Sequence, residues 1–79
     1  MNHVQARLFR LNNGDWVKAG DQVRAFLRDE PSTGQVSALF SRHSPGEDDR
    51  MARVVFRDGD AFTAHDLMVS AIQTVEIRA

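Results

Sequence analysis

The sequence predicts an all-β protein, a small barrel of five to six antiparallel strands with one short helical turn, in a single domain over residues 1–79. Residues 51–63, MARVVFRDGDAFT, have the pattern of two strands folded about Asp58-Gly59, a pair suited to a tight hairpin turn. Two further segments, Gly20-Asp21-Gln22-Val23-Arg24 and Thr33-Gly34-Gln35-Val36, each pass from turn residues into an alternating strand. Together these segments indicate a small twisted barrel.

The first third of the chain predicts a strand, a turn and a second extended segment. Residues 4–11 alternate with a period of two, and a bulge near Leu8-Phe9 accounts for a change of phase. Asn12-Asn13-Gly14-Asp15 is a turn cluster, because these residues tolerate a left-handed backbone. Trp16-Val17 then re-enters an extended segment that ends at Gly20-Asp21.

The middle of the chain predicts two more strands. Residues 22–28 alternate, with Val23, Ala25 and Leu27 on one face and Arg24, Phe26 and Arg28 on the other. Residues 29–34 contain Pro31 and Gly34 and predict a polar turn, followed by a strand over 35–42.

The last elements are a loop, a helical turn and a closing strand. Residues 43–50 carry turn residues and successive acids, which indicates an exposed, mobile loop. After the hairpin, Thr63 is placed to cap a short helical turn that ends near Val69. Residues 72–77 form the final strand, with Gln73, Val75 and Ile77 on one face.

Composition excludes several classes of function. Ten basic and 11 acidic residues give a net charge of −1, so no global field draws the chain to nucleic acid or to an anionic membrane. The chain has no cysteine and hence no disulfide or cysteine-ligated metal site. The N-terminus lacks an apolar signal core and no long hydrophobic run follows, so a cytoplasmic protein without membrane contact is expected.

No catalytic residue, metal ligand or cofactor is predicted. His65 lies next to Asp66, but neighbours in a chain do not usually point at one another. His43 with Ser44, or His43 with Asp48 and Asp49, would need the 43–50 loop to become ordered. Catalysis therefore remains only as an alternative, in an oligomer whose active site forms at a subunit interface.

The chain resembles the Tudor-like branch of the SH3-like small β-barrels between residues 20 and about 72. The resemblance is carried by Gly20-Asp21-Gln22-Val23, Gly34-Gln35-Val36, Val54-Val55-Phe56-Arg57-Asp58-Gly59 and Leu67. It implies a cage of aromatic rings around a methylated cation, with Phe26, Phe56 and Phe62 as walls and Asp58 or Asp60 as an acidic rim. The chain departs from the family in having no tyrosine, and Ser32 stands where another wall ring is expected. Burial frequencies favour a core position for Phe56.

Two other resemblances leave alternatives open. Residues 6–11 and 16–20 are similar to the opening of Ran-binding and related pleckstrin-like domains, which implies a truncated pleckstrin-like barrel as the alternative fold. The length and the Gly-Asp-x-Val-Arg start are similar to those of plasmid-type dihydrofolate reductases, which are SH3-like tetramers. The chain lacks their Val-Gln-Ile-Tyr segment, which argues against that activity.

The functional prediction is a non-catalytic adaptor that recognises a protein or peptide near the Asp58-Gly59 hairpin and the 29–34 turn. Phe26 and Phe62, with flanking charges, are the candidate contacts there, and Trp16 is a further candidate if it is exposed, although its size favours the core. The alternative is nucleic-acid binding by Arg24, Arg28, Arg53 and Arg57, which alternate along two strands, with Phe26 between the first two. Unpaired edge strands also allow homo-oligomers.

Overall fold

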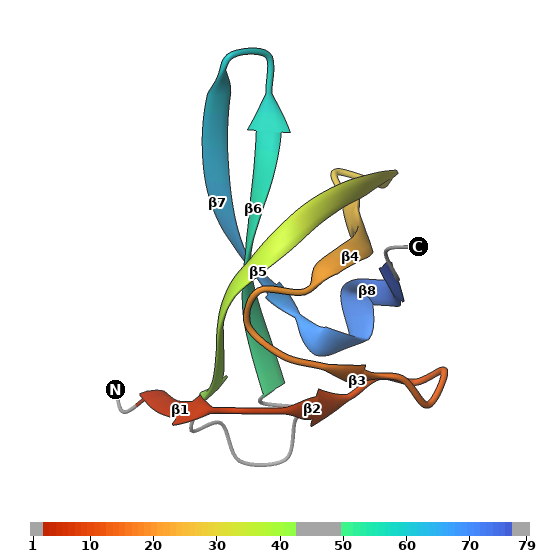
Figure 1. Cartoon of the computed structure of the whole chain (residues 1–79), viewed down its shortest axis with the longest axis vertical. Coiled ribbons are helices and arrows are strands. Elements are labelled where there is room, and N and C mark those ends of the chain that lie inside the picture. The colour runs from red at the N-terminus through yellow and green to blue at the C-terminus, as the bar shows by residue number, and fades with distance from the viewer. Residues whose placement is uncertain (1–2, 43–49, 77–79) are drawn as a thin grey trace.

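The computed structural model describes residues 3–42 and 50–76, and these residues confirm the all-β class. Within these ranges there are eight strands, one 3₁₀ turn and no α-helix. In chain order they are β1 (His3–Ala6), β2 (Phe9–Arg10), β3 (Trp16–Val17), β4 (Gln22–Leu27), β5 (Glu30–Arg42), β6 (Arg50–Asp58), β7 (Ala61–Met68), η1 (Val69–Ala71) and β8 (Ile72–Glu76) (Figure 1).

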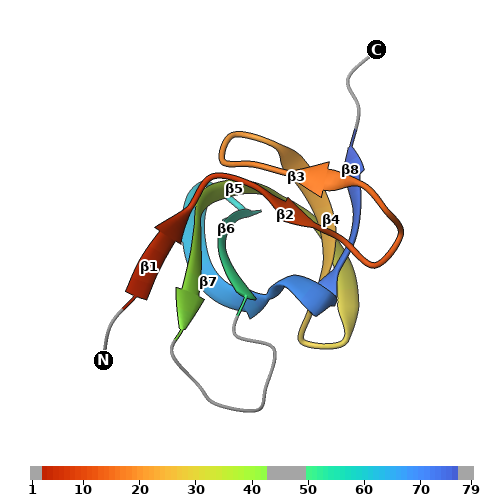
Figure 2. The ribbon, with the colours of Figure 1, turned by 90° about the horizontal axis from the view of Figure 1, so that it is seen from below.

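The main sheet has the strand order β7-β6-β5-β4-β8, and every pairing in it is antiparallel. β1 adds to the far end of β5, and β2 with β3 makes a separate ribbon. Figure 2 shows that the strands curl round one axis, with η1 leading from β7 to β8. β7 and β8 are not paired with each other, so the described residues form a curled open sheet and not a closed barrel.

β5 organises the sheet because it pairs with three strands along its 13 residues. Its register against β6 shifts between Val36 and Ala38, which leaves Ser37 as a bulge that bends the strand. At Gly34 the chain passes very close to β6, where an added Cβ would lie 2.6 Å from Val54 Cγ1. The missing side chain thus makes room for the core residues of β6.

The core lies on the inner face of this curled sheet. Alternation along β4 places Val23 and Ala25 inside with no exposed surface, while Arg24 and Phe26 point outward. This confirms the period-two prediction for β4. The packed inner cluster consists of Leu11, Val17, Val23, Ala25, Val36, Leu39, Ala52, Val54, Phe56, Val69 and Ile72.

The turn between β4 and β5 is shorter than predicted. Only Arg28 and Asp29 connect the strands, and β5 already begins at Glu30, so the predicted 29–34 turn is wrong. β5 begins to pair with β6 only at Gly34, so at Pro31 the strand has β4 on one side and a free edge on the other. Proline is tolerated inside a strand at such an edge.

Substituting the β4–β5 turn should stabilise the protein. Arg28 and Asp29 have φ angles of 51° and 64°, a left-handed conformation that Asn and Gly adopt more easily than other residues. We expect Arg28→Asn with Asp29→Gly to raise the free energy of unfolding by about 1–2 kcal/mol. Urea denaturation followed by circular dichroism measures this change, with Arg24→Asn on the exposed strand face as a near-neutral control. An unchanged midpoint would show that the native turn is not strained.

The hairpin between β6 and β7 confirms the prediction of two strands over residues 51–63, but its turn is displaced by one residue. The turn residues are Gly59 and Asp60, flanked by the pair Asp58–Ala61. Gly59 has a φ of 63° and Asp60 has no positive φ, which is the pattern of a turn with glycine in its first central position.

The helical turn also lies later than predicted. Residues 63–68 belong to β7, and the turn is η1, whose N-cap Met68 makes no side-chain hydrogen bond. Pairing with β6 along the whole of β7 outweighs the local capping preference of Thr63. In β8, an irregularity opposite Arg24 and Ala25 turns Ile72 inward and leaves Gln73 exposed, so the predicted face of this strand is wrong at Gln73.

At the N-terminal end, residues 4–11 form two separate strands instead of one bulged strand. β1 pairs with β5, whereas β2 pairs with β3, and the chain bends at Arg7 between them. The predicted loop at 43–50 lies outside the described residues apart from Arg50, which begins β6. Ile77 of the predicted final strand also lies outside them.

Candidate binding surfaces

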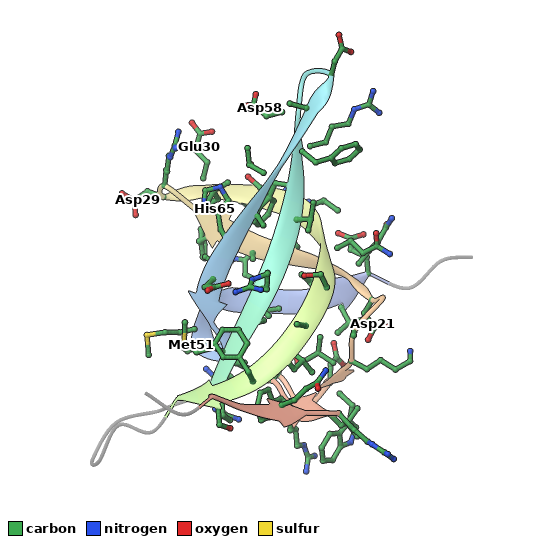
Figure 3. The ribbon with its side chains drawn as sticks, turned by 90° about the vertical axis from the view of Figure 1, so that its left-hand side faces the viewer. Asp21, Asp29, Glu30, Met51, Asp58 and His65 are labelled. Carbon is green, nitrogen blue, oxygen red and sulfur yellow. The ribbon has the colours of Figure 1, made fainter. Side chains whose placement is uncertain are left out.

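A groove of about 710 Å³ lies between the tips of the β4–β5 and β6–β7 hairpins, at the end of the sheet where the sequence places the working surface. We call it the hairpin groove. Figure 3 shows three of its lining residues, Glu30, His65 and Asp58, at this end, with Asp58 nearest the tip of the β6–β7 hairpin. The lining residues come from both hairpins and are Leu27, Arg28, Glu30, Ser32, Thr33, Phe56, Arg57, Asp58, Thr63 and His65.

Strand register brings the deeper part of the groove together. Thr63 lies directly opposite Phe56 and His65 directly opposite Val54, so all four share the inner face. Phe56 is 3% exposed, and the ring of His65 meets its ring edge-on at a centroid distance of 5.8 Å. The groove is therefore an uncovered continuation of the core, with hydroxyl and imidazole groups where the core has aliphatic ones.

The rim of the groove carries charges of both signs. Within the described parts of the chain, Arg28, Glu30 and Asp58 make no ion pair, and their side chains are exposed. Arg57 Nε donates to the carbonyl oxygen of Gly59 at 3.0 Å, which holds it against its own turn. The rim can therefore contact a ligand of either charge without first breaking an ion pair.

The structure does not bring Phe26, Phe56 and Phe62 together as cage walls. Phe62 lies opposite Arg57 on the outer face, and Phe26 lies opposite Pro31 on that same face, whereas Phe56 points inward. The cause is the period of a strand, which separates neighbouring hairpin positions onto opposite faces. Phe26 is 46% and Phe62 69% exposed.

Phe62 borders a second, smaller hollow of about 190 Å³ on the outer face. It is also lined by Gln22, Thr33, Gly34, Gln35, Val55 and Arg57. Asp58 flanks the β6–β7 turn and lines the hairpin groove, whereas Asp60 lies exposed in the turn itself.

The four arginines of the nucleic-acid alternative separate into three settings. Arg24 and Arg57 are exposed on the outer face, while Arg28 occupies the β4–β5 turn. Arg53 forms a forked contact with Asp66, with Nε to Oδ1 at 2.9 Å and Nη2 to Oδ2 at 3.3 Å. The hydrogen bond and the charge of Asp66 raise the pKa of Arg53 above its ordinary value. Arg53 is therefore engaged within the protein.

Trp16 is 55% exposed, so the core position predicted for it is wrong. In the two-residue strand β3 only one side chain can point inward, and that residue is Val17, which has no exposed surface. The guanidinium carbon of Arg10 lies 5.6 Å from the centre of the indole, a cation–π distance. Trp16 is therefore a surface residue, and its strand β3 lies at the opposite end of the molecule from the tip of the β6–β7 hairpin (Figure 1).

The histidines form no catalytic arrangement in the described residues. His65 and Asp66 point to opposite faces of β7, and Asp66 is bound to Arg53. Over residues 3–42 and 50–76 no three His, Cys, Asp or Glu side chains are grouped to hold a metal ion. The candidates His43, Ser44, Asp48 and Asp49 lie outside the described residues.

Thr63 and His65 line the groove but were not predicted there, whereas Ser32 lies in the 29–34 segment where the sequence places the working surface. Thr63 and His65 are assigned by local preference to a helical turn, although the alternation of the hairpin, continued through residue 68, would have placed them on the inner face with Phe56.

In the part of the chain that the structure describes, no helix is long and apolar enough to cross a bilayer. No family model, curated protein or solved structure matches the chain.

Proposed function

We propose that this protein is a non-catalytic binding module that holds a peptide segment of a partner protein in the hairpin groove. The observation that carries the proposal is the groove itself, whose volume of about 710 Å³ is within the range of known ligand sites. Because it runs between two hairpin tips and is open to solvent, it suits an extended chain that enters and leaves.

The chemistry of the groove supports a peptide ligand. Leu27, which is half-buried, and the small exposed part of Phe56 provide an apolar floor for one side chain of the ligand. Ser32, Thr63 and His65 offer donors and acceptors to a peptide backbone. The uncommitted charges of the rim would select the residues on either side of the anchored one.

We place the fold among the SH3-like small barrels, with the Tudor-like branch as the nearest form. The support is a sheet in which one long bent strand joins two hairpins, with a 3₁₀ turn before the last strand. Recognition of a methylated cation is not part of the proposal. The hairpin groove contains a single phenylalanine, Phe56, and that ring is almost fully covered.

A random peptide library displayed on phage tests the proposal. Thr63→Trp fills the groove from its wall, and Phe26→Ala is the matched control on the outer face. We expect selected peptides to bind the wild type and Phe26→Ala equally, and to lose about tenfold or more in affinity for Thr63→Trp. Amide chemical shifts should move at residues 27–33 and 56–65 when a selected peptide is added.

Two results would contradict the groove proposal. One is a library that yields no binding sequence for the wild type. The other is a selected peptide that binds Thr63→Trp as well as the wild type but loses affinity for Phe26→Ala, which would move the site to the outer face.

Single-stranded nucleic acid is the second candidate, and the outer face is the observation that favours it. Arg24 and Arg57 are exposed there together with Phe26 and Phe62, so the face offers phosphate contacts and rings on which bases stack. Fluorescence anisotropy with a labelled oligonucleotide would then show affinity that falls steeply with salt and is weakened by Arg24→Glu. Absence of binding at low salt would exclude this candidate.

A further inference from the structure

Strand β7 has a free edge that is long and accessible. It lies at one end of the main sheet and pairs with β6 alone among the described strands. The β6–β7 hairpin extends beyond the rest of the molecule (Figure 1). The other end of the sheet, β8, is shorter and partly covered, because Asn13 Nδ2 donates to the carbonyl oxygen of Gln73 at 3.1 Å. Of the two ends of the main sheet, β7 is thus the one more open to another strand.

The exposed apolar residues of β7 are arranged symmetrically. Phe62 is 69% and Met68 44% exposed, and the alternation of the strand puts both on the outer face. Phe62 stands three residues before His65, and Met68 three residues after it. Two copies of the strand, placed antiparallel about His65, would therefore bring each phenylalanine opposite a methionine.

We propose that two copies of this protein associate through β7, antiparallel, with the two-fold axis at His65. In this register Phe62 lies opposite the second copy's Met68, and Ala64 lies opposite the second copy's Asp66. On the inner face Thr63 meets Leu67, and the two His65 residues face each other at the axis. The contact is isologous, since the same strand supplies both sides.

Other registers are less favourable for physical reasons. Directly opposed residues of antiparallel strands have their side chains on the same face of the sheet. A two-fold axis midway between consecutive residues of β7 would therefore oppose outer side chains of one copy to inner side chains of the other. An axis at Ala64 would place Phe62 opposite Asp66, and an axis at Asp66 would carry Phe62 past the end of β7 to Ser70. Only the axis at His65 covers both exposed apolar side chains.

The backbone of β7 fits the same register. In a hairpin with a two-residue turn the flanking pair, here Asp58 and Ala61, exchanges hydrogen bonds, and the ladder then alternates. The N–H and C=O groups of Phe62, Ala64, Asp66 and Met68 therefore point away from β6. These are the residues that the proposed register opposes to one another, so the dimer would continue the sheet through the axis.

The dimer would place two hairpin grooves next to each other, because Thr63 and His65 line the groove and also flank the axis. The dimerisation proposal does not rest on peptide binding. If the hairpin groove binds peptides, the dimer would allow one partner with two binding segments to occupy both grooves.

A pair of substitutions at Ala64 tests the register. Ala64 is exposed, and in the dimer each copy's Ala64 would face the Asp66 of the other copy, which gives two equivalent contacts. We expect Ala64→Asp to raise the dimer dissociation constant by about tenfold through two like-charge pairs, and Ala64→Lys to lower it. Phe62→Ser should raise it by at least about tenfold, whereas Phe26→Ser, on the outer face of β4, should leave it unchanged. Sedimentation velocity over a concentration series gives these constants.

Cysteine cross-linking locates the axis independently. The chain has no cysteine, so one introduced cysteine can form a disulfide only with the same cysteine of a second copy. We expect His65→Cys to form a disulfide dimer under mild oxidation, and Thr74→Cys on the exposed face of β8 to remain mostly monomeric. A wild type that sediments as a monomer at every concentration overturns the proposal. So does a dimer that is unaffected by Ala64→Asp and Phe62→Ser.

Discussion

Replacing Phe56 with alanine is expected to lower the free energy of unfolding by about 3–5 kcal/mol. The ring is 3% exposed and belongs to the central cluster, so truncation removes its contacts and leaves a cavity beneath the hairpin groove. A loss of this size is a large part of the total stability of a small domain. Urea denaturation followed by tryptophan fluorescence and circular dichroism should show a transition at much lower denaturant, or an unfolded protein.

Two matched variants separate a core role for Phe56 from a role as an exposed binding ring. Phe56→Leu keeps most of the buried volume and should cost about 1–1.5 kcal/mol. Phe26→Ala removes the same side chain from a 46% exposed position and should cost less than about 1 kcal/mol. If Phe56→Ala were as stable as Phe26→Ala, the ring would not be part of the core.

Replacing Gly34 with alanine is expected to destabilise the protein by about 1–3 kcal/mol, although alanine is only one methyl group larger. The added Cβ would lie 2.6 Å from Val54 Cγ1 and 2.9 Å from both Cδ1 and Cε1 of Phe56. Val54 and Phe56 are both buried, so neither can move into solvent to relieve the overlap. The same denaturation experiment measures the loss.

The cause of the Gly34 effect can be isolated with two further variants. Gly20 has a φ of +96° and no atom within 4 Å of an added Cβ, so Gly20→Ala reports backbone strain alone, about 1–2 kcal/mol. Shortening the neighbour should relieve the overlap at Gly34, so Gly34→Ala combined with Val54→Ala should cost less than the sum of the two single changes. Additive costs would show that the overlap with Val54 is not the cause.

The parts of the fold that were predicted correctly are those where apolar and polar residues alternate along a strand. The alternation of Val23 and Ala25 with Arg24 and Phe26 gave the two faces of β4. The hairpin over residues 51–63 was predicted because turn residues lie between two alternating segments. The core position favoured for Phe56 is confirmed, although that preference rested on how often phenylalanine is buried and not on the alternation.

The errors arose where two local preferences competed or where a pattern was too short to read. The turn placed at Asp58-Gly59 instead of Gly59-Asp60 is one example, since both dipeptides suit a tight turn. Trp16 is another, because a strand of two residues has no period from which to tell the inner side chain from the outer one. Thr63 has a local preference for capping, but its position opposite Phe56 in β6 decides its conformation.

From the sequence alone the protein was determined to be an all-β chain with alternating strands, tight turns and an apolar set large enough for one small core. The tertiary structure alone decided which of those strands are neighbours, and hence that Leu27, Ser32, Thr63 and His65 meet around one groove while the exposed phenylalanines lie outside it. The reason is that alternation assigns a side chain to a face within its own strand. The curl of the sheet, set by the bulge at Ser37 and the close approach at Gly34, depends on contacts between distant parts of the chain.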